Sequence, residues 1–500
     1  MKRKPLNRSE KWCLAATLLC VALVVAAPIW WRIHNAPIEV WIPETKLPTP
    51  NAYDDYALAS IQIRNKNELE AAVSNYGTGL SLKPLPVTPK KDIVVTETFA
   101  PLPKRQILQR EYSIAEKTWL VSQNQAALLS IQSGLKHRCA QPPNMALFFG
   151  GTARPGFRYL FNLLTLRAQL QAQRGDVDGA LKTLLDEAQV SIGLMNDAST
   201  AAIALRGDER FATTELQKLL PQLNARQTRQ ALRRLETLDA QRPTYVQLLQ
   251  QEKRNTQRAL LQMFQDPKWR IPFAQSMVDN RSEWKDRAQI VQLNMTSERS
   301  IFNNYIEYMD VVVARVQKPF TKTEAPPFSA DIVTSNLMNE SVRLRGDYCR
   351  TQALTSLLLT SLALRSYQLE HGSFPTNLKA LMPRYLRQIP LDPFADQRPL
   401  RYALKPLRYI SDIRRIPTGR LVANRDYYPR APSSTPRKVA ETKPQFEYSI
   451  MPYTLYSVGA DAKDDKGQPI ENKAMRDSAR FRYFIDFDKS GDIVAGINTR

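Results

Sequence analysis

Two acidic stretches near the carboxyl end contain the residues whose types and spacing could bind a cation. The later one, Asp486–Ile493 (DFDKSGDI), matches several positions of the twelve-residue EF-hand calcium loop and ends its acidic run at Asp492. The twelfth position of such a loop needs a bidentate acid, but Ile497 occupies it. The flanks read as strands rather than helices. A hairpin turn that uses Asp and Gly for its geometry is therefore the favoured interpretation.

The earlier stretch, GADAKDD, contains Asp461, Asp464 and Asp465. Oxygen-rich acidic loops suit a hard cation that takes six to eight ligands, and the two stretches could converge on one ion. The alternative is a solvated acidic loop.

Other catalytic patterns are absent from the sequence. There is no GxSxG, HExxH, P-loop or dinucleotide-binding glycine motif, and the chain has only three histidines. His137 and Cys139 are neighbours, but one histidine and one cysteine do not make a metal site. We therefore expect that the protein is not an enzyme and has no catalytic residues. A pair of carboxylates in a hydrolase leaves no sequence pattern, so this alternative stays open.

The elements that must position the acidic residues lie in the last 150 residues. A helix is predicted over Ala353–Glu370, and its apolar stretch Leu357–Leu364 is too short to cross a membrane and is typical of a buried core helix. After it, Tyr, Val and Ile alternate with turn residues, which favours short strands. The chain ends in two predicted strands around a glycine turn.

Three motifs in this region resemble the C-terminal half of the type II secretion major pseudopilins (G-type). They follow one another in the family's order: a turn after the helix, a Pro- and Asp-containing stretch, and a closing GAD segment. Their residues are His371-Gly372-Ser373-Phe374-Pro375-Thr376, then Pro390, Asp392, Pro393, Phe394, Pro399 and Tyr402, then Tyr456-Ser457-Val458-Gly459-Ala460-Asp461. The resemblance implies an α+β module and calcium as its ion.

Calcium is implied because the loop after the GAD segment binds it in that family. Asp461 matches best, Asp464 and Asp465 share its loop, and Asp492 would join from the second stretch. The segment 1–31 has no prepilin peptidase site, so polymerisation as a major pseudopilin is not expected. The whole chain also resembles uncharacterised membrane-anchored bacterial proteins with a PNAYDDY start.

The N-terminus predicts a membrane anchor. Residues Trp12–Trp31 form an uncharged run, which at 1.5 Å per residue spans roughly 30 Å. Basic residues dominate before the run, so the positive-inside rule places the start of the chain in the cytoplasm and the bulk outside it. We expect a single-pass protein of the bacterial inner membrane. A cleaved signal peptide is the alternative.

Between the anchor and the module, the pattern is helical. Residues 36–104 are predicted as a Pro-rich stalk with one helix, and 105–350 as a helical domain. Residues 157–195 look like one tetratricopeptide-type hairpin, in which Gly175 ends a helix and Asp176 caps the next. Cys139 and Cys349 would lie on the oxidising side, where a bridge between them or two buried thiols are both open.

The predicted fold class is thus mainly α: a transmembrane helix in 1–35, a stalk in 36–104, a helical bundle in 105–350 and an α+β pseudopilin-like module in 351–500. The module contains a basic insertion, 401–444, with 11 Lys and Arg against 3 Asp and Glu. Tyrosines interleave with its basic residues. Binding to anionic polymers and a solvated loop are the two interpretations of this insertion.

These features together predict a membrane-anchored extracytoplasmic structural or interaction protein of the bacterial envelope. Its expected partners are the membrane, envelope or secretion-system proteins of a type II secretion or pilus-like assembly, and anionic envelope polymers. The net charge of +22 could suggest intracellular nucleic acid, but the predicted location argues against that partner. A carboxylate-pair hydrolase and an anionic-polymer-binding module are the alternative functions.

Overall fold

The computed structural model describes the chain in eight main stretches and a few isolated residues. The stretches are 46–74, 112–142, 156–195, 215–277, 290–318, 331–423, 438–472 and 491–499, and the isolated residues are 17, 38–40, 42, 201, 203–205, 207, 320, 483, 485 and 489–490. Within 336–343, 411–423 and 438–448 only the backbone is described.

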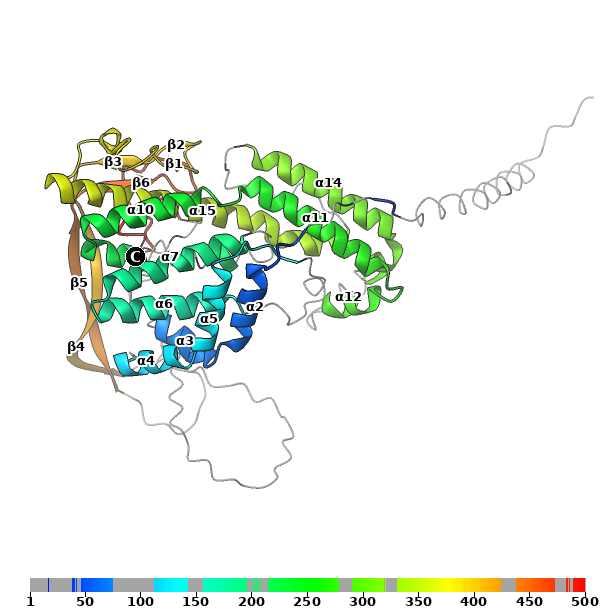
Figure 1. The fold of residues 1–500 in the computed structure, drawn as a ribbon, viewed down its shortest axis with the longest axis horizontal. Coiled ribbons are helices and arrows are strands. Elements are labelled where there is room, and N and C mark those ends of the chain that lie inside the picture. Colours follow the sequence, from blue (N-terminus) through cyan, green and yellow to red (C-terminus); the bar gives the residue numbers. More distant parts are fainter. Residues whose placement is uncertain are drawn as a thin grey trace, which may run out of the picture.

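Helices make up most of the described structure (Figure 1). Their bounds are α2 Ala52–Gln62, α3 Lys66–Ser74, α4 Ile114–Ser122, α5 Gln125–Gly134, α6 Arg158–Gln173, α7 Val177–Leu194, α9 Leu216–Leu219, α10 Ala225–Asp239, α11 Tyr245–Phe264, α12 Arg270–Met277, α14 Glu298–Val316 and α15 Ile332–His371, with short 3₁₀ turns at Leu220–Gln222 and Leu378–Leu381.

No helix in the described stretches is long and apolar enough to cross a membrane. This finding contradicts the transmembrane helix of the predicted fold class, the predicted signal anchor and the single-pass inner-membrane localisation. The predicted anchor itself, Trp12–Trp31, lies outside the described residues except for Thr17. The longest helix, α15, has 40 residues, but charged side chains interrupt it and its apolar stretch Leu357–Leu364 lies in a core.

The helical hairpin α6–α7 has the structure that the sequence predicts. Gly175 adopts a φ of +79° between the two helices, and the Asp176 carboxylate accepts a hydrogen bond from the Gly179 amide at 2.9 Å. This bond satisfies one of the amides that the first turn of α7 leaves without a helical partner. Leu164 of α6 packs in a first core with apolar side chains of α2, α11 and α14, whereas Ala168, one turn later, packs in a second core with those of α10 and α15. The hairpin therefore lies between the two cores.

The helix α15 is the structural link between the two ends of the molecule. In Figure 1 it runs from the group formed by α11, α12 and α14 to the small strands. Its first turn is capped by Asp331, whose carboxylate accepts from the Thr334 amide at 2.9 Å. It ends at Gly372, which has a φ of +75° and donates its amide to the Gln368 carbonyl at 2.8 Å. The predicted helix is therefore the second half of a longer one.

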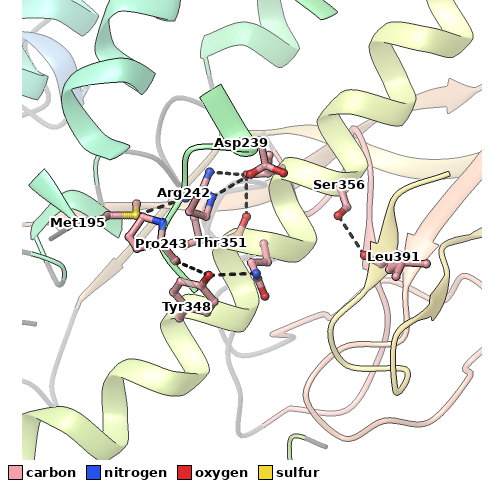
Figure 2. A network of polar contacts seen from close by, with 10 residues as sticks. Met195, Asp239, Arg242, Pro243, Tyr348, Thr351, Ser356 and Leu391 are labelled. Carbon is pink, nitrogen blue, oxygen red and sulfur yellow. Dashed lines mark hydrogen bonds and ion pairs between the residues drawn. The ribbon is translucent and has the colours of Figure 1, made fainter. Parts of the chain in front are cut away.

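A buried arginine joins α15 to the hairpin (Figure 2). The Arg242 side chain is 3% exposed and donates to the Asp239 carboxylate at 2.9 Å. It also donates to Thr355 of α15 at 3.3 Å and to the sulfur of Met195, just after α7, at 3.4 Å. A buried charge that keeps several partners holds its neighbours in one arrangement, since losing a partner leaves the charge desolvated and uncompensated.

The strands of the described residues form three small antiparallel sheets. Their bounds are β1 Leu391–Asp392, β2 Arg398–Pro399, β3 Arg401–Ala403, β4 Leu407–Ala423, β5 Lys438–Met451, β6 Thr454–Ser457 and β7 Ile493–Val494. The sheets have the orders β1-β2, β3-β6-β7 and β4-β5. The β4-β5 ribbon begins with Leu407 opposite Met451 and ends with Ala423 opposite Lys438. Most of the described part of the predicted basic insertion is therefore strand rather than an irregular loop.

The second core joins the strands to the helices. Buried apolar side chains from α7, α9, α10 and the second half of α15 pack together with those of the strands and their loops. Examples are Leu184, Leu219, Leu232, Leu358, Leu362, Leu455 and Ile493. Cys349 lies in this core and Cys139 packs on the first one, and neither forms a disulfide. The pair is therefore not bridged, and of the two predicted buried thiols Cys349 is buried whereas Cys139 is half-buried.

Candidate functional site

The predicted acidic residue Asp492 lies at the centre of a closed loop structure. It is fully buried, directly before β7. One carboxylate oxygen accepts the Gly467 amide at 2.7 Å, and the other accepts the Asp465 amide at 3.3 Å. Its own amide donates to the Gln468 carbonyl at 2.7 Å. Asp492 therefore holds the loop that follows the GAD segment.

Two glycines make this close approach possible. Gly459 and Gly491 have φ values of +73° and +126°, which residues with a Cβ rarely adopt. A Cβ on Gly459 would lie 2.7 Å from the Gly491 carbonyl oxygen, and a Cβ on Gly491 would lie 3.0 Å from the Ile470 backbone. The two loops thus pack backbone against backbone.

The other predicted acids have different partners. The Asp464 carboxylate accepts the Tyr456 hydroxyl at 3.0 Å and the Lys466 amide at 2.9 Å, and lies 3.4 Å from the Arg401 guanidinium. Burial alone would raise the pKa of Asp464, but these hydrogen bonds and the arginine charge lower it overall. Among the described residues, Asp461 accepts only the Lys463 amide, at 3.2 Å, through one oxygen.

The electrostatics around Asp492 are unfavourable to its charged form. Burial raises the pKa of Asp492 to about 7, and the negative charges of Asp465 and Asp464 add to the rise, while the two amides that it accepts oppose it. The second oxygens of Asp461 and Asp465 are buried and have no hydrogen-bond partner among the described residues. A cation near these oxygens would give them a partner and would favour the charged form of Asp492.

The structure nevertheless does not assemble a metal centre from the residues it describes. Among them, no group of three or more His, Cys, Asp or Glu side chains is placed so that it could hold a metal ion. Asp464, Asp465 and Asp492 share one loop region, but the two amides and Arg401 take up much of their ligand capacity. Asp486 and Asp488 lie outside the described residues. Calcium binding remains a prediction.

The three pseudopilin-like motifs contact one another directly. Asp392, in the second motif, is fully buried and accepts the Ser457 hydroxyl at 2.7 Å and the Val458 amide at 2.9 Å, both in the third motif. The Tyr402 hydroxyl, also in the second motif, donates to the Pro375 carbonyl of the first at 2.7 Å. Burial raises the pKa of Asp392, against the effect of the hydrogen bonds. The motifs therefore form one structural unit.

Sequence reasoning missed a groove between α7 and α10. It has a volume of about 990 Å³ and is lined by Leu181 and Leu185 together with the polar side chains of Asp178, Lys182, Asp186, Arg226, Arg229, Gln230, Arg233, Arg234 and Thr237. The spacing of Arg226, Arg229 and Arg233 by three and four residues was the available signal, because such residues share one face of a helix.

The ion pairs within the groove are few and solvent-exposed. Arg226 lies 3.7 Å from Asp178, and Lys182 lies 2.7 Å from Asp186. Arg229 also lines the groove, but its guanidinium pairs with Glu370 of α15, outside the groove, at 3.1 Å. Such exposed pairs hold their side chains weakly, since water screens them.

Comparison of the chain with protein-family models, with curated proteins and with solved structures finds no match.

Proposed function

We propose that this protein is a non-enzymatic interaction protein whose helical body presents the pseudopilin-like module to an assembly of pseudopilin-type subunits. The observation that carries the proposal is the second core, in which strands, α15 and the α7–α10 helices share buried side chains. A module fixed in this way transmits the position of the helical body to whatever binds the module, because a packed core does not deform continuously.

The placement of the carboxylates supports a non-catalytic role. Among the acidic side chains of the module that the structure describes, Asp392 and Asp492 have a raised pKa, as a general acid requires. Both are fully buried and use both of their oxygens to accept hydrogen bonds from neighbouring loops. Carboxyl groups bound in this way stabilise loops and are not directed at a substrate.

Exposed apolar side chains on the module offer a contact surface. Leu404 follows β3 and is 50% exposed, and Ile450 lies on β5 and is 68% exposed. The ladders pair Ala403 with Thr454 and Arg408 with Ile450, so Leu404 lies in the connection from β3 to β4 and Ile450 lies close to the connection from β5 to β6. Burying them against a partner would remove apolar area from water and stabilise a complex.

The test is binding of the full chain to a purified type II secretion major pseudopilin, measured by size-exclusion chromatography and by pull-down. We expect a complex that persists at about 0.5 M salt, because apolar contacts are not screened. Leu404→Asp with Ile450→Asp should abolish it. Ile61→Asp, at a residue of α2 that is 77% exposed, is the matched control and should leave it intact. A chain that stays uncomplexed, or binding equally insensitive to both sets of variants, would refute the proposal.

A further inference from the structure

The groove between α7 and α10 carries a charge excess that its own ion pairs do not use. Five basic side chains line it, Lys182, Arg226, Arg229, Arg233 and Arg234, against two acidic ones, Asp178 and Asp186, and of the five Arg229 is paired with Glu370 outside the groove. Arg233 is exposed and forms no ion pair or side-chain hydrogen bond within the described part of the chain. The Arg226 side chain is 78% exposed in its long pair with Asp178. The groove is therefore open to an anionic ligand.

The groove also has an apolar base. Leu181 and Leu185 of α7 line it and are 3% and 7% exposed, so only a small area of each faces the opening. The two leucines are one helical turn apart, and the basic residues of α10 lie across from them (Figure 1 shows the two helices side by side). An anionic ligand in the groove therefore also meets a small apolar area beneath it.

The dimensions suit a short polypeptide segment. Arg226 and Arg234 are eight positions apart on α10, which corresponds to about 12 Å along the helix. An extended chain covers that distance with about four residues. Asp178, Asp186 and Gln230 can accept hydrogen bonds from the amides of such a chain, whereas the phosphate or sulfate groups of an anionic polymer are themselves only acceptors. The lining also has no aromatic side chain on which a base could stack.

We propose that the α7–α10 groove is a binding site for an acidic peptide segment of a partner protein, with glutamate or aspartate side chains on the arginines of α10 and an apolar side chain over Leu181 and Leu185. This site is independent of the surface on the pseudopilin-like module, which lies on β3 and β5. The failure of one proposal therefore leaves the other standing.

The experiment measures fluorescence anisotropy of a short, labelled, glutamate-rich peptide that contains leucine, with the full-length protein. We expect saturable binding that weakens as salt rises, since the contacts are exposed ion pairs. Arg233→Glu should raise the dissociation constant about tenfold or more, a change equivalent to about 1.4 kcal/mol. Arg64→Glu is the matched control, because Arg64 is an exposed arginine outside the groove and the charge change is the same. It should leave the affinity unchanged.

Three results would overturn the proposal. One is equal affinity of the wild type and Arg233→Glu, with thermal melts showing that both are folded. Another is equal binding of a peptide in which lysine replaces glutamate. The third is displacement of the labelled peptide by heparin or a DNA oligonucleotide at lower concentration than by the unlabelled peptide, which would assign the groove to anionic polymers instead. Displacement by the unlabelled peptide alone supports the peptide site.

Discussion

At the scale of single residues, the buried carboxylate of Asp492 determines how the acidic loop responds to pH. The raised pKa means that the folded protein holds a proton on this group up to about pH 7, whereas an unfolded aspartate releases it near pH 3.8. Between these values the folded state binds more protons than the unfolded state. The stability that this group contributes is therefore greatest at low pH and falls as pH rises toward 7.

We predict that Asp492→Asn removes this pH dependence. The wild type should lose stability relative to the variant between about pH 4 and pH 7, by no more than about 4 kcal/mol for a pKa shift of this size. Thermal melts of both proteins across this range measure the difference. Asp396→Asn, at an exposed aspartate of the same module, is the control and should show no such trend. Parallel stability curves for wild type and Asp492→Asn would contradict the prediction.

The calcium prediction also belongs to this scale and can be tested separately. The buried oxygens of Asp461 and Asp465 and the raised pKa of Asp492 would all be relieved by a bound cation. We expect calcium to raise the melting temperature of the full chain and to release protons near pH 7, as Asp492 ionises. Asp461→Ala should remove both effects. An unchanged melting temperature in millimolar calcium would contradict the calcium binding that the pseudopilin resemblance implies.

At the scale of elements, local patterns predicted what local interactions determine. Gly175 and Asp176 placed the turn of the α6–α7 hairpin correctly, because a left-handed glycine and a capping carboxylate act within a few residues. The first half of α15 and the long β4-β5 ribbon were not predicted. Asp331 caps α15 far upstream of Ala353, and the ribbon depends on pairing between two strands whose partner residues lie 15 to 44 positions apart.

We predict that Gly459→Ala destabilises the protein much more than Gly175→Ala. Both glycines have a left-handed φ, which costs a residue with a Cβ about 1–2 kcal/mol. A Cβ at Gly175 meets nothing within 4 Å, but at Gly459 it meets the Gly491 carbonyl oxygen at 2.7 Å. Denaturant unfolding of the two variants isolates the packing of the two loops. Equal losses would show that this backbone contact is not tight.

At the scale of the whole molecule, the sequence motifs identified a C-terminal unit but not what it packs against. The hydrogen bond between Asp392 and Ser457 lies inside this unit. Both residues belong to motifs that can be recognised in the C-terminal part of the sequence. The contact between Arg229 and Glu370 joins the unit to α10, across residues whose types alone indicate only exposed charge. Such pairings depend on the three-dimensional arrangement of helices, which one sequence does not contain in readable form.

The same packing predicts that residues 351–500 do not fold when they are produced alone. Without α7, α9 and α10, the fragment would expose the apolar side chains of α15 and the strands that those helices cover, including Leu358 and Leu362. Each large apolar side chain left in water forgoes about 1.5–3 kcal/mol, so a few of them exceed the usual stability of a domain. Circular dichroism of the fragment should show no cooperative melt, whereas the full chain should melt cooperatively.

Extending the fragment to residues 157–500 supplies the missing half of the second core and should restore cooperative melting.

An ion pair across the interface tests this directly, because Glu370 of α15 reaches Arg229 only when α10 is present. Arg229→Ala should therefore lower the melting temperature of the longer fragment slightly, since a partly exposed pair contributes about 1 kcal/mol or less. Arg233→Ala, at an exposed arginine of the same helix, is the control and should leave it unchanged. If residues 351–500 melt cooperatively on their own, the helices and the module are joined loosely and the second core is not one unit.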